Sequence, residues 1–164
     1  MNNPKSTLVA GLGNPLMADE GIGVLLVQKL ALLSQNQEIS GCDDVEFYDG
    51  GVGGLSLLYK IEKRDKVILI DCARMGTPAG TIRRFTPAEV RTIKALEHFS
   101  LHEMDILKVF ELAEQFGNAP REIVIFGIEP KIIAFDSTLS DIIQQNSPRY
   151  LDDILNEIKA GGDS

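Results

Sequence analysis

Basic residues, cysteine, histidine and long apolar runs are all scarce in this sequence. The 164 residues contain 16 Lys and Arg against 24 Asp and Glu, so the formal net charge is −8. An acidic chain argues against nucleic acid as a partner, because phosphate binding needs a basic face. No apolar run approaches the length of about 20 residues that crosses a bilayer, so we expect no membrane association.

Only two cysteines are present, Cys42 and Cys72. They are too few and too far apart to form a metal knuckle, and we expect both to be reduced thiols. Residues 1–7 include no apolar region of the signal-peptide type. We therefore expect the protein to be cytoplasmic.

Common nucleophile and nucleotide motifs are missing as well. The sequence has no Gly-x-Ser-x-Gly elbow and no Gly-x-x-x-x-Gly-Lys loop. Gly11-Leu12-Gly13 looks like the start of a dinucleotide fingerprint, but Leu16 stands where the third glycine belongs. Asp19 and Glu20 would also repel a pyrophosphate, so we exclude nucleotide binding.

Short apolar runs alternate with helical patterns along the whole chain. Val67–Ile70 is uninterrupted, which is typical of a central parallel strand covered on both faces. Other strands are expected at 7–10, 45–48, 81–85 and 122–127, and helices at 21–34, 53–61, 86–96, 100–116 and 138–159. The alternation predicts one α/β domain over residues 1–164, with a doubly wound, mostly parallel, twisted sheet of about five strands flanked by helices.

Capping residues mark where the helices begin. Asp19 is the expected N-cap of the first helix. Capping boxes at Thr86–Glu89 and Ser100–Glu103 start two later helices. In the last helix we expect Pro148 to cause a kink rather than a break into two helices. Residues 131–135 are expected to form a short extended piece.

Acidic residues follow two of the apolar runs. Asp71 comes directly after Val67–Ile70, and Glu20 opens the helix after the first strand. Open α/β sheets build their sites at the carboxyl ends of the strands, so both carboxylates point to one crevice. Each also has a structural alternative, because Asp71 can satisfy loop N–H groups and Glu20 can complement the helix dipole.

The two histidines, His98 and His102, are spaced as two ligands on one helical face would be. The capping box at Ser100 places His98 before the helix, which argues against such a pair. His102 falls in the first turn, where the helix dipole favours the neutral imidazole that binds a metal. A surface histidine without a ligand role is the alternative.

Glu20, Asp71 and His102 together form a mixed oxygen and nitrogen set that suits a borderline divalent ion. We expect these three residues to bind the metal and to carry the catalysis. Asp49, Asn14 and Asp19 are expected to support this set or to contact the substrate.

These residues, in this order, resemble the hydrogenase maturation endopeptidases. The resemblance rests on Gly11-x-Gly13-Asn14-x-Leu16-x-x-Asp19-Glu20-x-Ile22-Gly23, then Asp49-Gly50-Gly51, Asp71, His102 and Gly127-Ile128-x-Pro130. It implies a cytoplasmic hydrolase, a protease that removes the C-terminal extension of a nickel-iron hydrogenase large-subunit precursor after nickel insertion. It also implies that the positions of Glu20, Asp71 and His102 contact the metal. We expect that metal to be nickel supplied by the precursor, and the protease to be a monomer.

Two points stay open at this stage. The metal either activates water and the scissile carbonyl or only reports that the precursor is loaded. The rival functions are a non-catalytic module that binds the precursor, an enzyme similar to peptidyl-tRNA hydrolases, and a metal-binding chaperone or sensor. Those hydrolases share a Gly-x-Gly-Asn-Pro-like turn, but they place a catalytic histidine near the position of Asp19 and Glu20.

Overall fold

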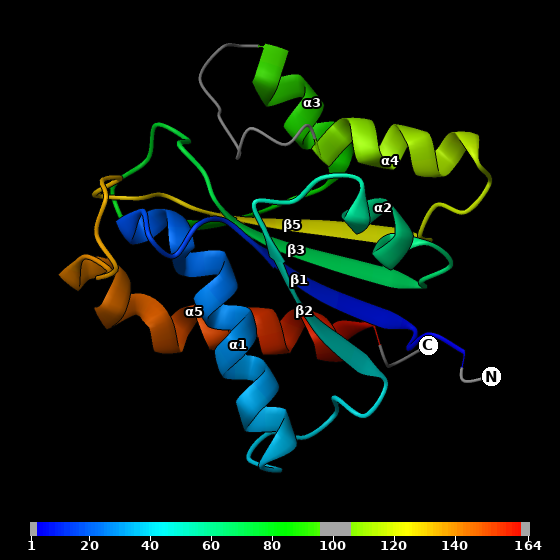
Figure 1. Cartoon of the computed structure of the whole chain (residues 1–164), viewed down its shortest axis with the longest axis horizontal. Coiled ribbons are helices and arrows are strands. Elements are labelled where there is room, and N and C mark those ends of the chain that lie inside the picture. The colour runs from blue at the N-terminus through cyan, green and yellow to red at the C-terminus, as the bar shows by residue number, and fades with distance from the viewer. Residues whose placement is uncertain (1–2, 96–105, 162–164) are drawn as a thin grey trace.

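The computed structural model describes residues 3–95 and 106–161, and Figure 1 shows how its elements are arranged. The elements in chain order are β1 (Thr7–Leu12), η1 (Ala18–Gly21), α1 (Ile22–Gln35), β2 (Val45–Gly51), α2 (Ser56–Ile61), β3 (Lys66–Cys72), β4 (Ile82–Phe85), α3 (Pro87–Ala95), α4 (Ile106–Gln115), β5 (Glu122–Ile128) and α5 (Asp141–Ala160).

The strands form one five-stranded sheet in the order β2-β1-β3-β5-β4. Strands β2, β1, β3 and β5 are parallel, whereas β4 pairs with β5 in the antiparallel sense at one edge. The carboxyl ends of the parallel strands therefore meet at one edge of the sheet, called here the carboxyl edge. The predicted doubly wound, mostly parallel sheet of about five strands is confirmed.

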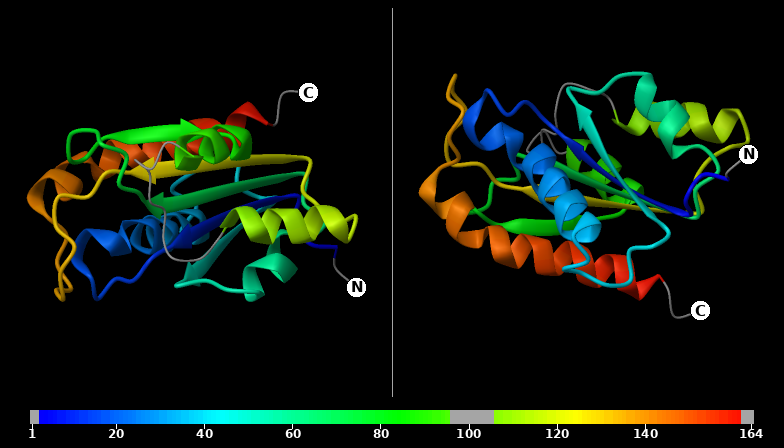
Figure 2. Two further views of the ribbon diagram at one scale, coloured as in Figure 1. Left: turned by 90° about the horizontal axis from the view of Figure 1, so that it is seen from above. Right: turned by 60° about the horizontal axis from the view of Figure 1, so that its bottom comes forward.

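Helices cover both faces of the sheet, as the views in Figures 1 and 2 show. Alternating residues of the strands separate the core into two clusters. Leu8 and Leu69 belong to the cluster with α2, α3 and α4, whereas Val9 and Ile68 belong to the cluster with α1 and α5. Strand β3 is buried along its whole length, as its apolar run predicted.

Most predicted helix boundaries agree with the structure. Thr86 Oγ1 accepts a hydrogen bond from the Glu89 N–H at 3.3 Å, so the first capping box is confirmed. α5 is one helix that contains Pro148, as expected. The second capping box, at Ser100–Glu103, lies outside the described residues.

Two local predictions are wrong. Residues 131–135 do not form a strand: the Ile132 carbonyl accepts a hydrogen bond from the Asp19 N–H, and the isolated bridge of Met17 is to Asp136, just after the segment. Asp19 is not the N-cap of α1: that position is Gly21, which has no side-chain cap. Asp19 lies inside the 3-10 turn η1, and its carboxylate bonds to a different part of the chain.

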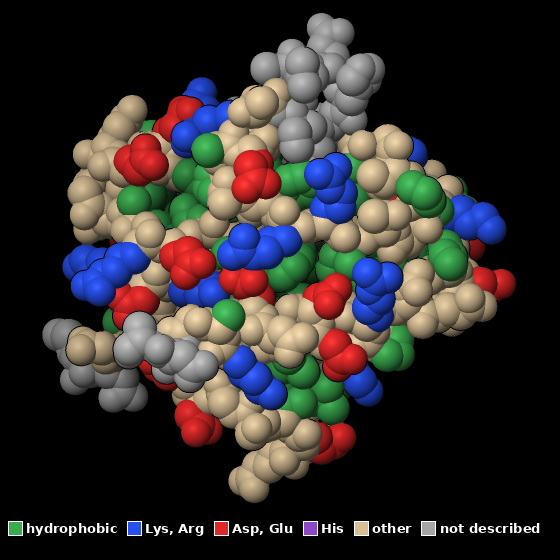
Figure 3. Space-filling view, turned by 180° about the vertical axis from the view of Figure 1, so that it is seen from behind, with side chains coloured by type: hydrophobic (Ala, Val, Ile, Leu, Met, Phe, Trp, Pro, Cys, Tyr) green, Lys and Arg blue, Asp and Glu red, His purple; other side chains and the backbone are tan. Residues whose placement is uncertain are grey.

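Among the described residues, no helix is long and apolar enough to cross a membrane. The face seen from behind the view of Figure 1 carries basic and acidic side chains interspersed with one another (Figure 3). No single-sign basic patch gathers on that face.

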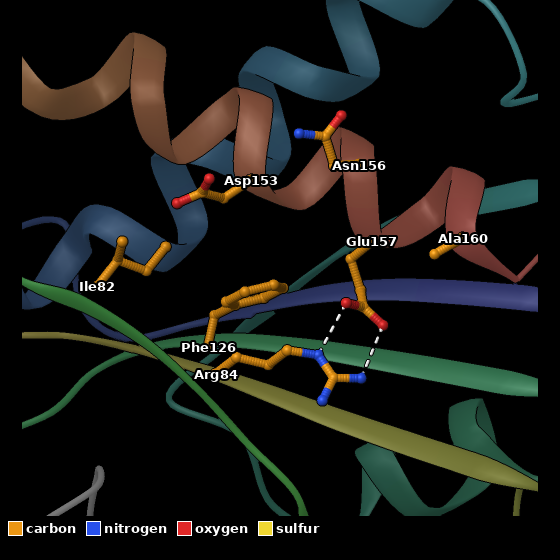
Figure 4. A pocket seen from close by; sticks show the side chains of 7 residues that line it. All are labelled: Ile82, Arg84, Phe126, Asp153, Asn156, Glu157 and Ala160. Atoms are coloured by element: carbon orange, nitrogen blue, oxygen red, sulfur yellow. Dashed lines mark hydrogen bonds and ion pairs between the residues drawn. The ribbon is translucent and has the colours of Figure 1, made fainter.

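An ion-pair network ties α5 to the sheet. The Glu157 carboxylate accepts hydrogen bonds from Lys66 Nζ at 2.8 Å and from Arg84 Nε at 2.8 Å. Lys66 lies at the start of β3 and is buried, and Arg84 lies on β4. Arg84 and Glu157 meet across a pocket of about 440 Å³ between the sheet and α5 (Figure 4). The charge of Arg84 is thus already balanced, and we assign no ligand to this pocket.

The Glu157 network makes stability depend on pH. The hydrogen bond from Arg84 lowers the pKa of Glu157 most, burial opposes it and Lys66 adds to it, leaving a pKa of about 2. Because the pKa is lowered on folding, the stabilisation is present above pH 5 and disappears as pH falls toward 2. We expect Glu157→Gln to lower the free energy of unfolding by about 2 kcal/mol at pH 7, measured by urea denaturation.

The matched control for Glu157→Gln is Asp65→Asn, which breaks the exposed ion pair of Asp65 with Arg121. We expect that control to change stability by less than about 0.5 kcal/mol, because both partners are solvated. The difference between Glu157→Gln and wild type should shrink at pH 2.5. Equal losses at both pH values would contradict the assignment.

Candidate functional site

Glu20 and Asp71 lie at the point where the winding of the sheet reverses. The chain leaves β1 toward β2 on one side, and it leaves β3 toward β5 on the other. Ligands of open α/β sheets bind in the crevice at such a switch point, outside the carboxyl ends of the strands. Glu20 follows β1 and Asp71 is the penultimate residue of β3, so both predicted carboxylates lie at this edge.

Glycines let the turn that carries Glu20 sit directly on the strand ends. A Cβ at Gly23 would lie 2.3 Å from the carbonyl oxygen of Ile70, the residue before Asp71. A Cβ at Gly13 would lie 1.9 Å from the carbonyl oxygen of Glu20, and the φ of Gly13 is +126°. Any side chain at either position would push the turn away, so both glycines are needed to hold Glu20 next to β3.

The burial of the two carboxylates differs. Asp71 is fully buried, whereas Glu20 is half-buried. Asp71 alternates with Leu69 and Ala73, which pack in the cluster with α2 and α4, so it lies on that side of the sheet. On this face α4 runs away from the carboxyl edge, toward the amino ends of the parallel strands (Figure 1).

Burial and the neighbouring acidic groups act in the same direction on the pKa of the Cys72 thiol. Burial raises the pKa of Cys72, and the negative charges of Asp71, Glu20 and Asp19 raise it further. Three carboxylates from η1 and β3 therefore lie within electrostatic reach of one sulfur atom. The thiol stays protonated at neutral pH, which makes Cys72 a core residue rather than a nucleophile.

The third member of the predicted set, His102, lies outside the described residues, as does His98. Within residues 3–95 and 106–161, no three His, Cys, Asp or Glu side chains form a group that could hold a metal ion. The described donors, Glu20 and Asp71, supply oxygen ligands only. Their chemistry fits a site that needs a further ligand from elsewhere.

Asp49 and Asn14 have structural partners. Asp49 is exposed at the carboxyl end of β2, where it accepts hydrogen bonds from Gly51 N–H at 2.9 Å and Gln28 Nε2 at 3.3 Å. Asn14 Oδ1 accepts from the Leu16 N–H at 3.0 Å and so closes the turn after β1. Their roles toward a substrate stay predictions.

Asp19 is the residue whose role sequence reasoning most misjudged. Its buried carboxylate accepts hydrogen bonds from the N–H groups of Lys131 and Ile132, both at 2.9 Å. Ser140 contributes two more, from its N–H and its Oγ, both at 2.7 Å. Burial raises the pKa of Asp19, but these hydrogen bonds outweigh it and the net pKa is lowered. Asp19 therefore ties the β1–α1 turn to the segment between β5 and α5.

Glu129 is an acidic residue at the carboxyl edge that the sequence reasoning missed. It is buried directly after β5, and its Oε2 accepts a hydrogen bond from the Met75 N–H at 2.8 Å. Its backbone pairs with Gly80 and Thr81, so it holds the loop after β3. Asp71 was singled out because it directly follows an apolar run. Glu129 directly follows the apolar run of β5, so the same signal marks it.

Replacing Asp19 tests the tether. We expect Asp19→Asn to lower the free energy of unfolding by about 2 kcal/mol, because the amide turns an N–H group toward backbone donors. Amide hydrogen exchange should accelerate at Ile132 and Ser140. Since folding lowers the pKa of Asp19, its contribution is present above pH 4 and lost on acidification, so the variant should resemble wild type at low pH.

Asp49→Asn is the matched control for the tether, because Asp49 is exposed and has only two weaker partners. It should change stability by less than about 0.5 kcal/mol and leave exchange at Ile132 unchanged. If Asp19→Asn and Asp49→Asn behave alike, the tether has no energetic importance.

Comparison with known proteins identifies the family. The family model for hydrogenase maturation proteases matches residues 24–157, a range that includes Asp71 and His102 and begins just after Glu20. The hydrogenase expression/formation protein HupD of Thiocapsa roseopersicina is 32% identical over 133 residues, which are 79% of this chain and 57% of that protein. The chain likewise spans 58% and 56% of two similar relatives from Azotobacter species.

Solved structures share the whole fold. The hydrogenase maturating endopeptidase HybD from E. coli superposes with a TM-score of 0.78 at 25% identity, covering 95% of this chain and 93% of that one. An endopeptidase from Escherichia coli gives a TM-score of 0.80 at 27% identity with the same coverage. With a family model matching most of its length and relatives above 30% identity, the chain belongs to the hydrogenase maturation protease family.

Proposed function

We propose that this chain is an endopeptidase that removes a C-terminal extension from the large-subunit precursor of a nickel-iron hydrogenase. Membership of the maturation protease family supports the proposal. The observation that supports it is that Glu20, in η1, and Asp71, near the end of β3, both lie at the carboxyl edge of the sheet. Two carboxylates at a ligand-binding edge are suited to hydrolytic proton transfer.

The half-buried Glu20 is the better candidate for the base. In this mechanism Glu20 takes a proton from the attacking water, whose oxygen bonds to the scissile carbonyl carbon. The carbon–nitrogen bond then breaks, and Glu20 returns the proton to the leaving amine. Asp71, which is fully buried at the same edge, would hold the reacting groups in place.

Nickel enters this proposal as part of the substrate. Glu20, Asp71 and His102 would contact the ion that the precursor carries, so that only a loaded precursor is held in the cutting position. A bound divalent ion supplies Lewis-acid polarisation of the scissile carbonyl. The oxygen-rich donors at this edge are compatible with such a contact, and we further propose that the enzyme acts in the cytoplasm as a monomer.

Substitution of the three residues tests the proposal. With a nickel-loaded precursor, we expect Glu20→Gln, Asp71→Asn and His102→Ala each to slow cleavage at least about a hundredfold, because each removes a proton-transfer or metal-contacting group. Release of the C-terminal peptide is followed by mass spectrometry. Asp65→Asn, an exposed change remote from the carboxyl edge, should cleave at the wild-type rate.

Two results would overturn the proposal. Full activity in Glu20→Gln and Asp71→Asn would remove the carboxylates from the chemistry. Tight binding of the loaded precursor by wild type without any cleavage would instead indicate a non-catalytic binding module. Equal cleavage of loaded and nickel-free precursor would leave the peptidase in place and refute nickel recognition.

A further inference from the structure

Exposed apolar side chains concentrate at the carboxyl edge. Nine large apolar side chains are exposed among the described residues, and six of them lie in the loops that follow β1, β2 and β5. These six are Leu16, Val52, Leu55, Ile132, Ile133 and Phe135. Single exposed apolar residues are normal on a protein surface, but a group of them marks an interaction site.

Four of these side chains belong to two loops that are joined to each other. We call Leu16, Ile132, Ile133 and Phe135 the apolar rim. The Ala18 N–H donates to the Asp136 carbonyl at 2.7 Å, and the Asp136 N–H donates to the Leu16 carbonyl at 2.9 Å. The two loops that carry the rim are therefore neighbours in space, although Leu16 and Phe135 are far apart along the chain.

The backbone of the rim is fixed rather than loose. The Asp19 N–H donates to the Ile132 carbonyl at 3.1 Å, and the buried Asp19 carboxylate accepts from Lys131 and Ile132 in return. Rigid presentation lowers the conformational entropy lost on binding. Phe135 is nevertheless 85% exposed, so this ordered loop holds an aromatic ring in solvent.

The rim is also coupled to the candidate base. Asp19, the residue that anchors the rim, is the direct sequence neighbour of Glu20, and both lie in η1. Any polypeptide whose scissile bond approaches Glu20 must therefore pass close to the rim. The formal charges within the rim segment, Lys131 and Asp136, oppose each other, so the surface suits an uncharged apolar partner.

We propose that the apolar rim is the docking surface for an apolar segment of the hydrogenase precursor that flanks the scissile bond. This inference rests on the proposed function, because it takes the precursor as the occupant. Its apolar side chains would pack on Phe135 and Ile132, which places the neighbouring peptide bond at Glu20. A second copy of this chain is the competing occupant, and the test includes it.

Phe135→Ser is the test variant, and Phe116→Ser is its matched control. Phe116 is 63% exposed and directly follows α4, whose C-terminal end lies on the side of the sheet away from the carboxyl edge (Figure 1). With nickel-loaded precursor, we expect Phe135→Ser to raise KM and the dissociation constant about tenfold while kcat stays within about twofold. Phe116→Ser should have the wild-type KM, dissociation constant and kcat.

The outcomes separate this inference from the proposed function. Unchanged KM and binding in Phe135→Ser, with normal cleavage by wild type, would overturn the docking surface and leave the peptidase intact. Binding without cleavage by wild type, weakened in Phe135→Ser, would overturn the peptidase and support the surface. A wild-type dimer in sedimentation that Phe135→Ser dissociates would assign the rim to a second copy and refute the proposal.

Discussion

The buried carboxylate of Asp19 is the interaction on which the candidate site depends. It receives four hydrogen bonds from Lys131, Ile132 and Ser140, and so closes the turn after β1 against the loop after β5. Burying a charge is favourable only where hydrogen-bond donors replace the water that solvated it. Without these four donors the fold would contain an uncompensated buried charge. The position of Glu20 follows from it, because Glu20 is the next residue in the same 3-10 turn.

The large features of the fold could be predicted from the sequence because they depend on local patterns. The uninterrupted run Val67–Ile70 indicated a strand covered on both faces, and β3 is indeed the most buried strand. Thr86 with Glu89 indicated a capping box, which the structure contains. Such features need only the periodicity or spacing of neighbouring residues, so tertiary contacts do not alter them.

The wrong assignments concern residues whose partners are distant. An aspartate before an apolar helical pattern is a good N-cap, and nothing near Asp19 in sequence shows that its partners lie more than 110 positions away. Gly21 takes the N-cap position because the preceding turn is 3-10. Glu129 also stands next to a strand end, and what its position alone does not show is the contact to Met75, which crosses from β5 to the loop after β3. The placement of Glu20 and Asp71 succeeded because both stand next to strand ends.

The acidic residues of the carboxyl edge have two different roles. The carboxylates of Asp19 and Glu129 are buried and accept hydrogen bonds from backbone N–H groups. They therefore position loops and are unable to accept a proton from water at the same time. Glu20 is half-buried and directly follows Asp19 in η1, so it reaches the surface of the same edge. Loops held by buried hydrogen bonds lose little conformational entropy when a partner binds, so this edge is preformed. These fixed loops carry exposed apolar side chains such as Phe135 next to the turn that contains Glu20.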